Sequence, residues 1–147
     1  MKTIVILDND PGSLQGMEGI LQRHGFVLFP VTTAAEAAAL SLRPDITIDL
    51  LIAGMNGAGN TSARELHESC PEIPLLLVSE SPLENWPETE FLYFKSLSSR
   101  TDFLRKPLKA GTFVSRINSL LYNSTYTAGR QIFEAAAALR QAPVHAT

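Results

Sequence analysis

Four polar residues, each following an apolar run, are the side chains of this sequence best suited to chemistry. They are Asp8, Asp49, Ser79 and Lys106, and the runs before them are 3–7, 46–48, 75–78 and 103–105. Short apolar runs bounded by turn residues are typical of buried parallel strands, and ligands bind at the carboxyl ends of such strands. We therefore expect two carboxylates, a hydroxyl and an ammonium to meet in one crevice. That set suits a magnesium ion and a phosphoryl group.

The elements that must position these residues alternate between strand and helix. The pattern predicts strands over 3–8, 26–31, 46–51, 75–79 and 102–105, and helices over 11–24, 33–42, 60–70, 88–98 and 109–122. Such βα alternation predicts an α/β domain, here a doubly wound sheet of five parallel strands with helices on both faces.

The pattern changes after Tyr122. A polar stretch, 123–127, precedes a predicted helix over 128–141 that carries Ile132, Phe133 and a run of alanines. We therefore predict a domain over 1–122 and a C-terminal helical tail over 123–147. The tail helix could pack on its own domain or pair with another chain, so a homodimer is one expectation.

Composition limits the function classes. The 147 residues favour a single domain, and a net charge of −3 with a pI near 5.6 argues against a nucleic-acid partner. The single cysteine, Cys70, excludes an internal disulfide. No apolar stretch reaches transmembrane length and no signal peptide is visible. We expect a cytoplasmic protein without a membrane partner.

The residues at the predicted strand ends resemble those of receiver domains of bacterial two-component response regulators, over roughly residues 3–122. That family has an acidic cluster after its first strand, matched by residues 8–10. It has a Ser or Thr after strand four and a Lys-Pro pair after strand five, matched by Ser79 and by 106–107. Its acceptor aspartate precedes a loop glycine by eight residues, as Asp49 precedes Gly57.

The resemblance implies a flavodoxin-like fold of the receiver type and a signalling function. Asp49 would accept a phosphoryl group from a histidine kinase or phosphotransfer protein, as an acyl phosphate. Lys106 would neutralise one phosphoryl oxygen and Ser79 would donate a hydrogen bond to another. The domain would then signal through a downstream protein partner instead of turning over a substrate. The implied Mg²⁺ ligands are Asp8, Asn9, Asp49 and the backbone carbonyl of Leu51.

Five positions depart from the family pattern. Asn9 stands where a second carboxylate is usual, which predicts weak magnesium binding. Ala53 and Asn56 replace a loop proline and aspartate, Glu80 replaces a small residue, and Phe103 lacks the hydroxyl of a switch aromatic. Asn9, Glu80 and Phe103 favour an alternative, a pseudo-receiver that keeps the fold for protein contact and does not cycle phosphate. Asp49, Ser79 and Lys106 favour the phosphoryl-accepting receiver.

A third interpretation is enzymatic. Asp8 and Asp10 also resemble the Asp-x-Asp of haloacid-dehalogenase-type phosphohydrolases, in which Asp8 would be the nucleophile and Asp10 the acid/base. That family needs a further acidic cluster after its lysine, and no aspartate follows Lys106. The sequence therefore favours this interpretation least.

Overall fold

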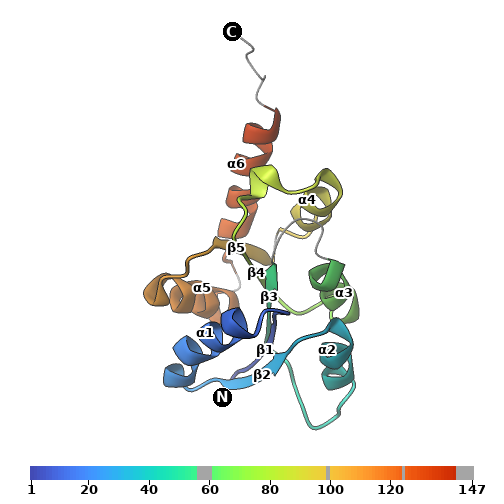
Figure 1. The fold of residues 1–147 in the computed structure, drawn as a ribbon, viewed down its shortest axis with the longest axis vertical. Helices are drawn as coiled ribbons and strands as arrows, with labels where there is room; N and C mark the ends of the chain where they lie inside the picture. Colours follow the sequence, from blue (N-terminus) through green and yellow to red (C-terminus); the bar gives the residue numbers. More distant parts are fainter. Residues whose placement is uncertain (56–60, 99, 124, 142–147) are drawn as a thin grey trace.

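The computed structural model describes residues 1–55, 61–98, 100–123 and 125–141. Five parallel strands form one sheet in the order β2-β1-β3-β4-β5 (Figure 1). They are β1 (Thr3–Leu7), β2 (Val27–Val31), β3 (Leu50–Met55), β4 (Leu75–Ser79) and β5 (Thr101–Arg105). This strand order is that of flavodoxin-like folds, so the predicted fold class is confirmed.

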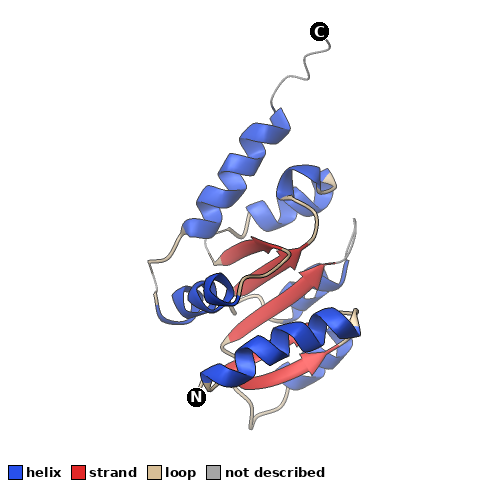
Figure 2. Cartoon of the chain, turned by 60° about the vertical axis from the view of Figure 1, so that its left-hand side comes forward, coloured by secondary structure: helices blue, strands red, loops and turns tan. Residues whose placement is uncertain are grey.

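Helices cover both faces of the sheet (Figures 1 and 2). The helices are α1 (Pro11–Leu21), α2 (Ala34–Ser41), α3 (Thr61–Ser69), α4 (Glu88–Lys95), α5 (Ala110–Tyr122) and α6 (Ala128–Gln141). Alternate residues of a strand point to opposite faces, and β1 shows the consequence. Ile4 and Ile6 pack in the apolar cluster beneath α1 and α5, whereas Val5 and Leu7 pack in the cluster that includes α2, α3 and α4.

The third strand does not lie where the sequence pattern predicted. β3 spans Leu50–Met55, and 46–49 have no regular structure, so the predicted strand over 46–51 is displaced by four residues. All six residues of β3 are buried. A central parallel strand is covered on both faces, which favours the uninterrupted apolar stretch over the shorter run that contains the exposed Thr47.

Two helical predictions also need adjustment. The first helix ends at Leu21, and a 3-10 turn, Gln22–His24, leads to Gly25 with φ 77°, a left-handed conformation that glycine adopts without strain. The fourth helix ends at Lys95, three residues earlier than predicted, and an unpredicted 3-10 turn, η2 (Leu83–Asn85), precedes it. None of the helices that the structure describes is long and apolar enough to cross a membrane.

The C-terminal helix packs on its own domain. α6 lies against β5, η2 and α4 (Figure 2). Phe133 and Ala136 are buried in the same apolar cluster as Phe91 of α4. Gly129 is needed where α6 meets the edge of the sheet, because a Cβ there would overlap the carbonyl of Thr101. The helix thereby covers the outer edge of β5, which would otherwise be open for pairing with another strand.

Arg140 holds the C-terminal end of α6 against the rest of the domain. Its Nη1 donates to the carbonyl of Trp86 at 2.6 Å and, at 3.1 and 3.3 Å, to the carbonyls of Glu84 and Leu83. Its guanidinium lies 4.6 Å from the centre of the Phe91 ring. One arginine therefore ties α6 to both the η2 turn and α4.

Candidate functional site at the carboxyl edge of the sheet

Asp8 is a buried carboxylate at the end of β1. Leu7 lies beside Ala53 in the sheet, which places Asp8 next to Gly54. Asp8 has no solvent exposure. Its Oδ1 accepts a hydrogen bond of 2.9 Å from the backbone of Asp10, and its Oδ2 lies 3.6 Å from Nζ of Lys106. The charge of Asp8 is therefore compensated within the protein.

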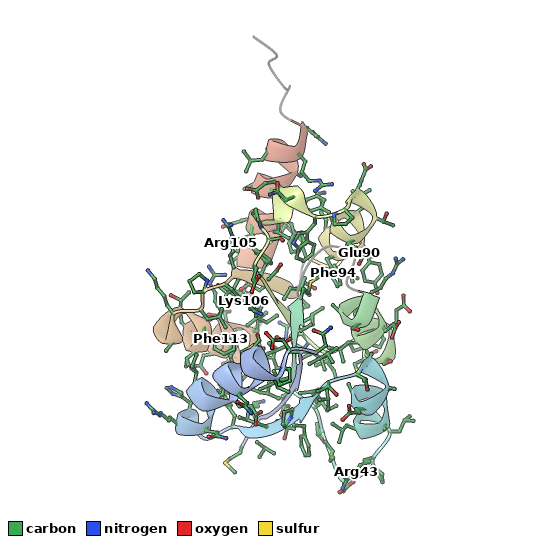
Figure 3. The ribbon with its side chains drawn as sticks, viewed as in Figure 1. Arg43, Glu90, Phe94, Arg105, Lys106 and Phe113 are labelled. Carbon is green, nitrogen blue, oxygen red and sulfur yellow. The ribbon has the colours of Figure 1, made fainter. Side chains whose placement is uncertain are left out.

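Ser79 and Lys106 lie at the same edge. The backbone N–H of Lys106 donates to the carbonyl of Ser79 at 2.8 Å, and Nζ of Lys106 donates to Oγ of Ser13 at 2.7 Å. Arg105 and Lys106 follow one another at the end of β5 (Figure 3). Ser79 is buried, and its Oγ accepts from the backbone of Ser81 at 3.1 Å. The structure thus brings together three of the four predicted residues: Asp8, Ser79 and Lys106.

Asp49 lies at the opposite, amino-terminal end of the strands. Its backbone N–H donates to the carbonyl of Thr3 at 2.9 Å, and its Oδ2 accepts from the N–H of Thr3 at 2.8 Å. Its Oδ1 lies 3.9 Å from Nζ of Lys2. Thr3 and Asp8 are five residues apart on one strand, which corresponds to about 16 Å at the usual rise per residue. The prediction that Asp49 shares a crevice with Asp8 is wrong, because Asp49 directly precedes β3 instead of ending it.

Gly54 lies at the carboxyl end of β3. It neighbours Val78 in the sheet register, one residue before Ser79. A Cβ at Gly54 would overlap the carboxylate of Asp8, so Asp8 fills the space that a side chain from this position would need. The loop residues Asn56 and Gly57, which supported the sequence resemblance, lie outside the described residues.

The residues predicted to hold magnesium do not fit that ion. Leu51 lies in the middle of β3, fully buried, and Asn9 is exposed. Asp10 accepts from the N–H of Gly12 and caps α1. No group of three or more His, Cys, Asp or Glu side chains in the described part of the chain could hold a metal ion. With Asp49 at the amino-terminal end of the strands and Asp8 paired to Lys106, the acidic donors that Mg²⁺ requires are not gathered among the described residues.

Comparison with known proteins agrees with this fold. No family model matches the sequence. Protein PilH of Pseudomonas aeruginosa is 26% identical over 124 residues, which are 82% of this chain and 98% of PilH. A response regulator receiver domain protein from Clostridium thermocellum superposes with a TM-score of 0.62 and 17% identity, covering 82% of this chain and 94% of that one.

Chemotaxis protein CheY4 of Vibrio cholerae gives a TM-score of 0.65 at 16% identity, covering 82% of this chain and 99% of CheY4. The fold is that of a response-regulator receiver domain. In this receiver fold, Ser79 ends β4 and Lys106 follows β5, as the sequence resemblance implied. The chain departs from the pattern that the resemblance implied at the end of β3, where Gly54 lies.

Trp86 packs on Phe103, the aromatic residue of β5, a contact that the sequence did not specify. Phe103 of β5 is buried, and the Trp86 ring meets it edge-on with centroids 5.6 Å apart. Trp86 also meets Phe94 of α4 at 6.1 Å, and its Nε1 donates to the carbonyl of Ser81 at 3.2 Å. Since Ser81 in turn donates to Ser79, the end of β4, the η2 turn and β5 form one connected unit.

A second missed feature is a buried polar cluster on the α5 side of β5. Asp102 is fully buried, and both its carboxylate oxygens lie 3.1 Å from Nη1 of Arg116. The Tyr126 hydroxyl donates to Asp102 at 2.6 Å. Burial, followed by the hydrogen bond to Asp102, raises the pKa of Tyr126 to about 12. An aspartate near the start of a buried strand was the sequence signal for this cluster.

Proposed function

We propose that this receiver-fold domain is a pseudo-receiver, a protein-interaction module that does not cycle phosphate. The observation that carries the proposal is Gly54. In the family that the sequence resembles, an aspartate at the end of the third strand accepts the phosphoryl group. Here Gly54 lies at that end of β3, and the carboxylate of Asp8 fills the space beside it.

Neither nearby nor distant carboxylates replace the missing acceptor well. Asp8 is buried and paired with Lys106, so a phosphodonor has no open path to an unengaged oxygen. Asp49 is the acceptor that the sequence resemblance implied. Its position speaks against that role, because the ammonium and hydroxyl that would stabilise a phosphoryl group lie at the other edge of the sheet.

The remaining site residues support a structural role. Lys106 compensates the buried charge of Asp8 and bonds to Ser13 of α1, which joins β1, α1 and the end of β5. Removing one member of a buried ion pair typically costs about 3–5 kcal/mol, because the other charge is left uncompensated, so the buried Asp8 requires Lys106 even without phosphate chemistry. A histidine kinase or phosphotransfer protein that binds this domain would, on this proposal, be a contact partner and not a phosphodonor.

Intact mass spectrometry after incubation with acetyl phosphate and Mg²⁺ tests the proposal. The expected result is no added phosphoryl group, while a receiver that carries the family's acceptor aspartate gains one under the same conditions. Beryllofluoride with Mg²⁺ should likewise leave the amide spectrum of this domain unchanged.

A stoichiometric mass gain would overturn the proposal, and two variants would locate the modified residue. Loss of the gain in Asp49→Asn would assign the acceptor to Asp49. Loss in Asp8→Asn alone would assign it to Asp8.

A further inference from the structure

A groove of about 420 Å³ lies between α4 and the C-terminal half of α6. Its lining combines an apolar floor with charges of both signs: Phe91, Leu92, Ala137, Gln141, Glu84, Glu88, Lys95 and Arg140. Leu92 is one of the few large apolar side chains that the structure leaves exposed, with 53% of its surface accessible. Figure 3 shows the α4 side of this region, where Glu90 and Phe94 are labelled.

The exposed stripe of α4 has a regular order. Glu88, Leu92 and Lys95 are spaced by four and three residues, so they share one face of the helix. The acidic residue lies toward the start of α4, the basic residue at its end, and the exposed leucine between them. Phe91 lies beside this stripe and is buried at the floor of the groove, whereas Phe94 is buried further round the helix.

The charges on this stripe have no ion-pair partner in the described part of the chain. Every salt bridge found there involves other residues. Glu88 and Lys95 cannot pair with each other, because seven residues separate them by about 10 Å along a helix. Their order, acid to base along one face, is complementary to the same face running in the opposite direction.

We propose that the α4–α6 groove is a homodimer interface, in which α4 packs antiparallel to the partner's α4 across a two-fold axis near Leu92. In that arrangement Glu88 faces the partner subunit's Lys95, and Lys95 faces the partner subunit's Glu88. Such an isologous interface makes each contact twice, which fits a second copy of this chain better than an unrelated partner. Leu92 fills the centre, where apolar contacts contribute most.

α6 completes this surface. It supplies Ala137 and Arg140 to the groove, and it covers the edge of β5, which directs pairing away from that strand and toward α4. The inference rests on the proposed function only in that both assign the domain a role in protein contact. Dimer formation requires no phosphodonor.

Sedimentation equilibrium of the full chain, without phosphodonor or Mg²⁺, tests the interface. The wild type is expected to be a dimer, and Leu92→Glu a monomer with an unchanged circular dichroism spectrum. Leu42→Glu is the matched control, because Leu42 is 83% exposed at the end of α2, away from the groove, and this variant should remain dimeric.

Charge reversal gives the more specific test. Glu88→Lys and Lys95→Glu should each raise the dimer dissociation constant about tenfold, since each turns two attractive contacts into two repulsive ones. The double variant, Glu88→Lys with Lys95→Glu, should return close to the wild-type constant. Only a two-fold pairing of these residues predicts that recovery.

A monomeric wild type would overturn the proposal, as would a double variant no tighter than the single ones. Either result would leave the pseudo-receiver proposal intact, because that proposal depends on the mass measurement after phosphodonor treatment. Conversely, a domain that is phosphorylated and still dimerises through Leu92 would contradict the proposed function and support the proposed interface.

Discussion

The carboxylate of Asp8 occupies the space that a side chain at Gly54 would need. Asp8 and Gly54 lie side by side at the ends of β1 and β3, and Lys106 lies 3.6 Å from the same carboxylate oxygen. The glycine therefore permits the Asp8–Lys106 pair to close over the end of the sheet. A receiver acceptor at this position would have to displace that pair.

Gly54→Ala should destabilise the domain by about 1–3 kcal/mol, because its Cβ overlaps a buried carboxylate that is held by an ion pair. Gly16→Ala is the control. A Cβ at Gly16 meets nothing within 4 Å, so this change in α1 should stabilise by about 0.5–1 kcal/mol. Urea unfolding of both variants measures the difference, and a Gly54→Ala protein as stable as the wild type would show that Asp8 moves aside without cost.

The alternation of strands and helices made the fold predictable, and so did the residues at three strand ends. Asp8, Ser79 and Lys106 each follow an apolar run that is a strand in the structure. Asp10 caps α1 in the structure, and an aspartate directly before a proline is a typical start of a helix.

The register of β3 could not be fixed in the same way. Two apolar segments, 46–48 and 50–55, flank Asp49, and a short segment alone does not tell which side of the aspartate is the strand. Burial on both faces decided for 50–55, and that information belongs to the assembled sheet. The Trp86 and Arg140 contacts also join segments distant in sequence, which no local pattern encodes.

Asp49 should behave as a structural residue. Asp49→Ala removes the acceptor for the Thr3 N–H and the ion pair with Lys2, so it should cost about 1 kcal/mol in the free energy of unfolding. Asp49→Asn keeps an oxygen that can accept from Thr3 and should cost less. Urea denaturation compares the two. Equal losses in both variants would mean that charge, and not the hydrogen bond, is what this position contributes.

α6 should contribute to the stability of the domain, which differs from the separable tail over 123–147 that the sequence suggested. Phe133→Ala should lower the free energy of unfolding by about 3–5 kcal/mol, because Phe133 is fully buried against the domain. Leu139→Ala, on the same helix but 60% exposed, should change it little. Similar small effects of both substitutions would show that α6 is only loosely attached.

The Asp102–Arg116–Tyr126 cluster should give the domain a specific sensitivity to alkaline pH. The pKa of Tyr126 is raised from 10.0 to about 12 in the folded protein, first by burial and then by Asp102. A raised pKa means that the fold favours the neutral phenol, so the stability that Tyr126 contributes is complete below pH 10 and is lost as the pH rises toward 12.

The free energies of unfolding of the wild type and Tyr126→Phe, measured with urea, should therefore differ most near neutral pH, where the lost hydrogen bond to a carboxylate costs about 1.5–3 kcal/mol. The difference should narrow between pH 10 and about 12. Tyr122→Phe, which removes an exposed phenol, is the control and should change stability little throughout. A gap between wild type and Tyr126→Phe that stays constant up to pH 12 would contradict the raised pKa and the donor role of the Tyr126 hydroxyl.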